Sequence, residues 1–479
     1  MSGPDPTTVP LFLVLAAPVA GAVLALLPSG RASEVAARSA ALVSVAAAVA
    51  LIVGGVHGTW GPYLGLDALS EVFLLMVTSV YATSAWYSAR YLRSVQHPFL
   101  SPQVYYSLLG AFAFAMVGSL VVTDLGLIWI GIEATTVASA LLIVLERRPA
   151  SVEAAWRYTL IASAGLTIAL LALLMLYTVA GSLNLSQLAA HPPAVSLPLE
   201  MVVALALVGF GTKVGLFPMH TWLPDAHSEA PSPVSAMFSG VLLPTALYAF
   251  LRVYLVVPAP VPPVLTDLLI AFGVATALVA AFLLQRQHSY KRLLAYSSME
   301  VMGIALLGVA VGGIALYGVL VLLLAHAFAK SAAFYCAGNV LQSTGTTRIA
   351  EVSGLRDRLP WTGAAWILTG AAVTGAPPFG TFVGELLIVA GAVAAGYVWL
   401  AVVLVVAIAV AFLGVNSQIG RMVLGDPRPS SPSPAGAGDS GVGVIYLNVV
   451  LAAALGVASW PYLTPILRSA TTLLGGSLP

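Results

Sequence analysis

The chain has 479 residues, of which 60% are hydrophobic and only 8% charged, with a formal net charge of +1 at pH 7. So little charge cannot cover the surface of a water-soluble protein of this length, so lipid must be the solvent for most of it. The near-neutral balance excludes a basic nucleic-acid-binding surface. The one cysteine, Cys336, excludes a disulfide framework and a cysteine-ligated zinc or iron–sulfur site within this chain.

Apolar runs long enough to cross a bilayer recur along the chain and predict about 14 helices. The first is expected to be a retained helix, because MSGPDPTTVP lacks the basic region of a signal peptide. The seventh and twelfth runs are long and broken. The expected spans are 10–28, 37–55, 66–89, 103–121, 125–145, 154–180, 199–222, 234–257, 263–284, 290–311, 314–340, 361–396, 398–420 and 441–470.

The basic residues alternate along the chain, and fifteen of the nineteen fall at every second connection between the predicted helices. By the positive-inside rule, these connections are cytoplasmic and both termini lie on the outer side. The fifteen are Arg31, Arg38, Arg90, Arg93, Arg147, Arg148, Arg157, Arg286, Lys291, Arg292, Arg348, Arg356, Arg358, Arg421 and Arg428. An odd helix count would have scrambled this alternation, so the sequence predicts an even number.

The predicted helices divide into four parts: N-terminal helices in 1–100, a first repeat in 101–258, a second repeat in 259–425, and a linker with the last helix in 426–479. The linker is the low-complexity stretch RPSSPSPAGAGDSG at 428–441, which is typical of a flexible connection. None of these parts is a soluble domain large enough to hold a catalytic core.

Two runs are interrupted by proline in mid-membrane, at Pro218 in GLFPMHTWLP and at Pro377 and Pro378 in TGAPPFGTF. Lipid cannot satisfy the backbone groups that such breaks free, so they are expected where protein or water surrounds them. The breaks lie five predicted helices apart. Because five is odd, helices 4–8 and helices 9–13 are expected to form two inverted five-helix repeats.

Each expected repeat carries ionisable residues at membrane depth. Glu133 and Glu300 lie ~14 and ~15 Å into the fifth and tenth helices at 1.5 Å per residue. Lys213 and Glu385 belong to the two broken helices. His326 and Lys330 are an i,i+4 pair on one face of the eleventh helix.

Two interpretations account for these groups, since an isolated charge at mid-bilayer costs ~3 kcal/mol. In the first, they are fixed ion pairs that lock helices together, such as Glu133 with Lys213. In the second, they form a proton relay. Burial disfavours the charged forms of carboxyl and amino groups, so both can exchange protons near neutral pH, and water lets the proton hop.

Other polar positions have simpler interpretations. His326 could be a hydrogen-bonding core histidine, and Lys330 could extend to the cytoplasmic surface. Arg157 is expected to be an interfacial anchor. Asp225 and His227, which with His220 are secondary site candidates, are expected in a loop as capping or turn residues. Asp67 and Glu71 are expected at the outer interface.

The stretch GFGTKVGLFPMHTWLPDAHSEAPSPVSAMFSGVLLPTALYAFLR at 210–252 closely resembles the signature of the proton-conducting, antiporter-like membrane subunits of respiratory complex I, Mrp-type antiporters and group-4 membrane-bound hydrogenases. IEATT (132–136), KRLLAYSSME (291–300), AHAFAKSAAF (325–334) and APPFGTFVGELLI (376–388) extend the resemblance over roughly 60–420. Among these subunits, the sequence of the motifs is most similar to that of hydrogenase-4 component F.

The resemblance implies fourteen core helices in inverted repeats and a proton relay through Glu133, Lys213, His326, Lys330 and Glu385. It also implies a subunit with no cofactor, metal or redox site of its own. Its partners would be other integral membrane subunits and a peripheral hydrogenase-like or quinone-reductase-like module, in the cytoplasmic membrane of a prokaryote.

This sequence departs from the family at two places. Pro244 stands in the eighth helix, where complex I members have a bridging lysine, and Val301 follows Glu300 where hydrogenase-type members have histidine. Two alternatives therefore stay open: a secondary cation/proton antiporter of the Mrp kind, which would move Na+ or K+, and a non-conducting anchor of a redox complex. The electron donor, the electron acceptor and the ion stoichiometry are not encoded in any motif of this chain.

Overall fold

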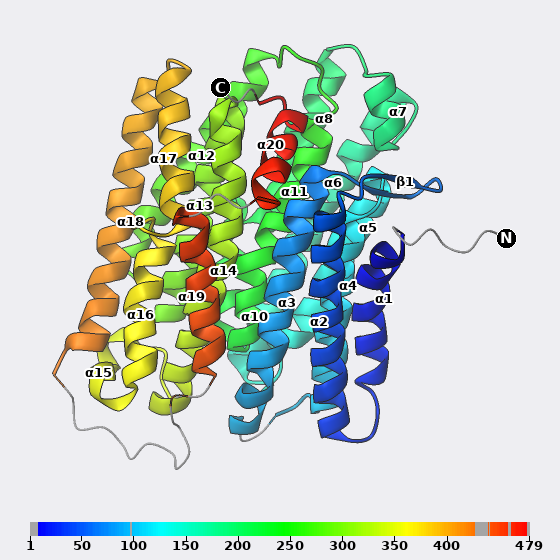
Figure 1. Ribbon diagram of the computed structural model, residues 1–479. Helices are drawn as coiled ribbons and strands as arrows, with labels where there is room; N and C mark the ends of the chain where they lie inside the picture. Colours follow the sequence, from blue (N-terminus) through cyan, green and yellow to red (C-terminus); the bar gives the residue numbers. More distant parts are fainter. Residues whose placement is uncertain (1–7, 96–97, 427–438, 440, 458–460, 477–479) are drawn as a thin grey trace.

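The computed structural model describes residues 8–95, 98–426, 439, 441–457 and 461–476. Within them, 11 helices are long and apolar enough to cross a membrane, and α1 (Val9–Leu24), α17 (Gly380–Ala394) and α19 (Val442–Val457) are shorter apolar helices. They stand side by side as one bundle (Figure 1). The predicted all-α polytopic membrane protein is thereby confirmed, while the number of crossings and the repeat layout stay predictions.

The remaining elements follow in chain order. The N-terminal part adds α2 (Gly30–Gly54), β1 (Gly58–Trp60), β2 (Leu64–Leu66) and α3 (Ala68–Ser94). The next part holds α4 (Pro102–Leu120), α5 (Leu125–Ile143), α6 (Pro149–Ala180), α7 (Leu185–Ala190), α8 (Leu197–Val214), η1 (Met219–Thr221), α9 (Trp222–Glu229), α10 (Ser232–Met237), η2 (Phe238–Leu242) and α11 (Leu243–Tyr254). The last part holds α12 (Pro263–Leu284), α13 (Tyr290–Val311), α14 (Ile314–Thr344), η3 (Ile349–Glu351), α15 (Leu355–Arg358), α16 (Pro360–Val373), α18 (Val398–Leu424) and α20 (Leu463–Leu473).

Several predicted boundaries were wrong. The second and sixth helices begin at Gly30 and Pro149, earlier than expected, because each extends into a polar end that apolar patterning does not detect. The last predicted helix is two helices, α19 and α20. The twelfth, which was expected to be broken, consists of α16 and α17 on either side of its break. Most of the predicted linker at 428–441 lies outside the described residues.

Short polar side chains fix where the helices start. Asp124 accepts hydrogen bonds from the backbone N–H groups of Gly126 and Leu127 at the start of α5. Asp67 does the same for Ser70 at the start of α3. Burial alone would raise the pKa of Asp67, but the bidentate Arg252 guanidinium, 2.6 and 2.7 Å away, holds it below its usual value. Asp67 therefore links α3 to α11 at the helix ends.

The two helix breaks have the same backbone construction. Each helical half ends at a glycine with positive φ, Gly215 (+84°) and Gly375 (+66°). The next residue donates its N–H to the carbonyl five positions back: Leu216 to Gly211, and Ala376 to Ala371. Both segments then pass through a cis proline, Pro218 or Pro378, before helix resumes.

Two isolated β-bridges form a second pair of matching features, one at the ends of the helix pair α5 and α6 and the other at the ends of the helix pair α13 and α14. Asp124 forms an isolated antiparallel bridge with Asn184, and Ser289 forms one with Arg348. Each bridge joins the residue before one helix to a residue after the next. These repeated details support an internal duplication of the unit that contains each break.

One end of the bundle carries most of the arginines and is called the basic face. It includes the start of α2, the end of α3, the α5–α6 and α12–α13 connections, and α15 at the lower end of Figure 1. The β1–β2 hairpin, α7 and α20 lie toward the opposite end. Glu71 is fully buried, and its Oε2 lies 2.8 Å from Nε2 of His57, the residue directly before β1.

Candidate functional site

The first cluster of buried polar groups surrounds Lys213, in the last turn of α8 directly before the break. Lys213 is 0% exposed, and its Nζ donates to Thr136 Oγ1 of α5 and to Tyr158 Oη of α6, each at 2.6 Å. Its Nζ also lies 4.5 Å from the Tyr158 ring centroid. Three helices thus converge on one amino group, and both hydrogen-bonding partners are neutral hydroxyls.

Glu133 lies one helical turn before Thr136, so the two side chains share a face of α5. Its Oε1 accepts a hydrogen bond from Ser163 Oγ of α6 at 2.7 Å, while its Oε2 is buried without a hydrogen-bond partner among the described residues. The expected direct pair with Lys213 is not formed. The carboxylate and the amino group still interact electrostatically, and Thr136, one turn from Glu133 on α5, accepts the lysine's hydrogen bond.

The second cluster gathers Glu300 of α13, Lys330 and His326 of α14, and Glu385 of α17. Lys330 is fully buried, which rules out the alternative that it extends to the surface. Its Nζ donates to the Leu294 carbonyl at 2.9 Å and to Ser297 Oγ. Glu300 is 2% exposed and interacts electrostatically with both Lys330 and Glu385.

Glu385 is placed by the second break. It is 4% exposed, and its carboxylate lies so close to Gly375 that a side chain there would overlap it. Pro377 and Pro378 belong to this break, as Pro218 belongs to the first. Each cluster therefore combines a lysine and at least one glutamate beside an interrupted helix.

Histidines and a π-helical segment occupy the space between the clusters. His227 was expected in a loop, but it lies in α9 and is 0% exposed. Its Nδ1 is 2.8 Å from the Leu223 carbonyl, while its Nε2 has no hydrogen-bond partner among the described residues. The ring lies 5.6 Å from that of Phe238 and 6.0 Å from that of Phe334.

His326 is also 0% exposed, and neither ring nitrogen has a hydrogen bond of normal geometry within the described chain. It lies beside the backbone of Ser239 in η2, the π-helical turn that precedes Pro244. Ser239 Oγ is 2.6 Å from Ser298 Oγ of α13. π-helical turns are rare and occur frequently at functional sites, which agrees with the position of η2 beside His326.

The other two secondary candidates lie apart from this interior. Asp225 is in α9, not a loop, and it pairs with Arg157 at 3.3 Å and with Arg292 at the basic face. His220 lies in η1, 8% exposed, with its ring 6.4 Å from that of Tyr296. Arg157 is half-exposed, and its interfacial position stays a prediction.

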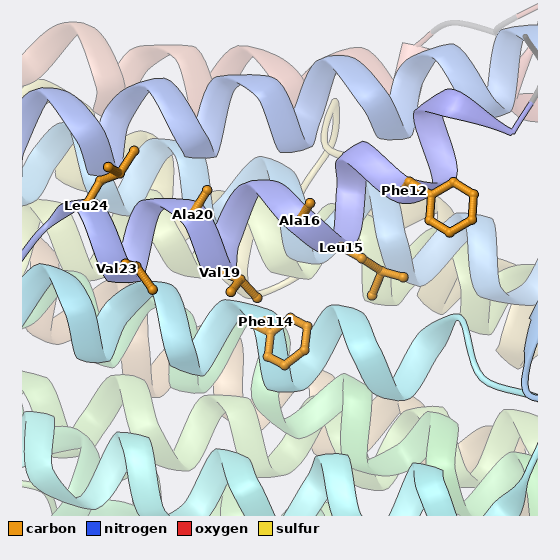
Figure 2. A pocket seen from close by; sticks show the side chains of 8 residues that line it. All are labelled: Phe12, Leu15, Ala16, Val19, Ala20, Val23, Leu24 and Phe114. Carbon is orange, nitrogen blue, oxygen red and sulfur yellow. The ribbon is translucent and has the colours of Figure 1, made fainter. Parts of the chain in front are cut away.

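A wholly apolar groove lies between α1 and α4, away from both clusters (Figure 2). Its volume is about 620 Å³. None of its lining residues can carry a proton: they are Phe12, Leu15, Ala16, Val19, Ala20, Val23, Leu24 and Phe114. The groove is a lipid-facing surface feature and not part of the polar interior.

Comparison with known proteins identifies the family of the chain. Residues 122–411 match the family described as NADH:quinone oxidoreductase/Mrp antiporter, TM. The chain is 34% identical over 387 residues to a hydrogenase-4 component F homolog of Methylacidiphilum infernorum, covering 78% of this chain and 81% of that one. It is 32% identical over 455 residues to NADH-quinone oxidoreductase subunit N of Desulforudis audaxviator, covering 90% and 89%.

Solved structures share the fold. A chain of the membrane-bound sulfane sulfur reductase, an archaeal respiratory membrane complex, superposes with a TM-score of 0.87 at 23% identity, covering 98% of this chain and 97% of that one. A chain of Thermus thermophilus respiratory complex I superposes with a TM-score of 0.81 at 25% identity, covering 97% and 100%. The chain belongs to the NADH:quinone oxidoreductase/Mrp antiporter family of membrane proteins.

Proposed function

We propose that this chain is a proton-translocating membrane subunit of a redox-driven complex and carries no redox chemistry of its own. The observation that carries the proposal is the pair of buried clusters, each with lysine and glutamate beside an interrupted helix. The similarity to hydrogenase-4 and NADH-quinone oxidoreductase subunits supports redox-module and membrane-subunit partners. We place the chain in the cytoplasmic membrane of a prokaryote, with both termini outside and its repeats inverted.

The first cluster is the loading site in this mechanism. A charge or conformational change in a neighbouring subunit alters the electrostatic interaction between Glu133 and Lys213. When the carboxylate no longer stabilises the ammonium, burial favours the neutral amine, and Lys213 releases its proton. The second cluster accepts protons on Lys330 and Glu300 and passes them to Glu385, which lies at the second break.

The test replaces the two central groups of the first cluster. Lys213→Ala and Glu133→Gln are each expected to lower redox-coupled proton translocation by ~100-fold or more, because a required proton carrier or its modulator is lost. Proton uptake is measured with a pH-sensitive dye in everted membrane vesicles, energised with the electron donor that the co-purified redox module oxidises.

Arg157→Gln, at the basic face, serves as the control and is expected to translocate normally. Undiminished translocation in both cluster variants, at normal levels of assembled complex, would contradict the relay. Sodium or potassium flux through the purified chain alone in proteoliposomes would instead favour a secondary antiporter. Assembly with redox turnover but no proton movement in the unmodified complex would favour a non-conducting anchor.

A further inference from the structure

The chain uses lysine sparingly, and always in its interior. It contains three lysines, Lys213, Lys291 and Lys330, against sixteen arginines. All three are buried, with 0%, 1% and 0% of their surface exposed. Arginine keeps its proton under all physiological conditions, whereas a buried lysine can release one. Two of the three belong to the clusters described above, but Lys291 belongs to neither.

Lys291 was expected to be one of the surface cations that set membrane orientation, but it is the second residue of α13 and points inward. Its Nζ donates to the Ala230 carbonyl, between α9 and α10, at 2.5 Å. This is its one hydrogen bond within the described residues, so two N–H groups remain for water. An adjoining cavity of about 10 Å³ is lined by Lys291, Ser151, Glu146, Arg148 and Glu229. That volume is near the smallest that can hold one water molecule.

Partly exposed charged groups form the mouth of this cavity at the basic face. The side chains of Glu146 and Glu229 are 36% and 26% exposed. Arg148 lies between them, 3.2 Å from Glu146 and 3.7 Å from Glu229. The two carboxylates can collect protons from the aqueous side and present them to the water beside Lys291.

The same helix leads from Lys291 to the second cluster. Leu294 and Ser297, which accept hydrogen bonds from the Lys330 amino group, lie three and six residues further along α13. Six residues of helix span ~9 Å. Lys291 and Lys330 thus approach the same stretch of α13 from the aqueous side and from mid-membrane.

We propose that Lys291 is a proton-uptake group that loads the second cluster directly from the basic face. This proposal rests on the proposed function. A proton passes from Glu229 or Glu146 through water to the neutral Lys291 amine. The resulting ammonium gives one proton through water to the neutral Lys330 amine and returns to its starting state. Lys330 then passes a proton to Glu300, so the route does not require a bridging group at Pro244.

A purely structural role is the alternative, in which Lys291 only ties α13 to the Ala230 carbonyl. Lys291→Arg distinguishes this structural role from proton uptake, because arginine keeps the charge and a hydrogen-bond donor but cannot release a proton. Lys291→Gly removes the side chain and leaves space for a small amine. The matched control is Arg292→Gln, whose native side chain is a neighbouring basic group, 39% exposed and paired with Asp225.

The experiment measures proton translocation per redox turnover in everted vesicles that contain the assembled complex. Lys291→Arg and Lys291→Gly are expected to lower it by about 10-fold or more, and Arg292→Gln to leave it within about 2-fold. Ethylamine added on the exposed basic face is expected to restore part of the rate in Lys291→Gly. Assembly is checked by the yield of co-purified subunits and by redox turnover.

Wild-type translocation in Lys291→Arg would overturn the proposal. So would a loss in both variants that ethylamine does not relieve while the complex is intact. These outcomes differ from failure of the proposed function. If the chain did not translocate protons at all, Lys213→Ala would also be without effect, whereas failure of the Lys291 proposal alone leaves the Lys213→Ala defect in place.

Discussion

Thr136 and Tyr158 are the side chains that hold the Lys213 amino group. The spacing of Glu133 and the lysine indicated two buried charges, but a direct ion pair between them was the simplest expectation. In the structure the amino group instead donates to the Tyr158 hydroxyl and to the Thr136 hydroxyl, and the latter hydrogen bond forms a bridge from α8 to α5. Thr136 could have been predicted from the sequence as part of the cluster, because it lies one turn after Glu133 on the same helix. Tyr158 could not have been predicted in this way, because its hydrogen bond with Lys213 depends on how α6 packs against α8.

Thr136→Val tests this bridge, because valine has nearly the same shape but no hydroxyl. Loss of the bridge is expected to leave the buried amine short of one partner, which costs about 1–3 kcal/mol of stability. It is also expected to slow proton translocation by about 10-fold. The measurements are thermal unfolding of the purified complex and proton uptake in everted vesicles.

Thr135→Val is the matched control. The Thr135 hydroxyl is also buried, but it donates to the Ile132 carbonyl of its own helix at 2.6 Å. It is expected to translocate protons at the normal rate. Equal effects of the two substitutions would show that the bridge has no specific role.

At the scale of elements, the breaks in α8–α9 and α16–α17 position the charged side chains. Their location was predicted, because proline and glycine inside an apolar run interrupt helix hydrogen bonding. Their shared geometry was not: both end in a left-handed glycine, and Gly375 also makes room for the Glu385 carboxylate. His227 was misplaced at this scale, because the polar, proline-containing stretch TWLPDAH at 221–227 has the composition of a loop, although most of it forms the short helix α9.

Gly375→Ala is expected to displace Glu385, since an added Cβ would occupy the position of its carboxylate oxygen. Proton translocation is expected to fall by about 10-fold or more. The left-handed backbone of alanine is expected to cost a further ~1 kcal/mol of stability. Gly345→Ala is the control that separates backbone strain from the displacement of Glu385. Gly345 also has a positive φ, of +70°, but a Cβ added there meets nothing within 4 Å.

Comparable thermal destabilisation of the two alanine variants, with a translocation defect in Gly375→Ala alone, is the expected result. It is read from unfolding temperature and from proton uptake in parallel. Normal translocation in Gly375→Ala would show that the position of Glu385 is not critical.

For the whole molecule, family membership identifies the fold, but the proposed proton translocation depends on the other subunits of the complex. Purification in mild detergent followed by mass spectrometry is expected to recover other membrane subunits and a peripheral redox module. A nickel–iron or iron–sulfur protein among them would agree with the proposed function. Recovery of Mrp-type subunits instead would contradict the redox assignment and favour cation/proton antiport.

Composition, apolar run length and charge alternation were enough to predict a multi-pass helical membrane protein, because the bilayer demands long apolar segments with internally paired backbones. The motifs predicted the family, the buried Lys213, Glu300, His326, Lys330 and Glu385, and the partly buried Glu133. Helix packing alone decided which groups touch: Thr136 and Tyr158 with Lys213, Ser297 with Lys330, and the inward Lys291 that looked like a surface charge. Those contacts join helices distant in the chain, and side-chain direction at a helix end depends on neighbours that no local pattern specifies.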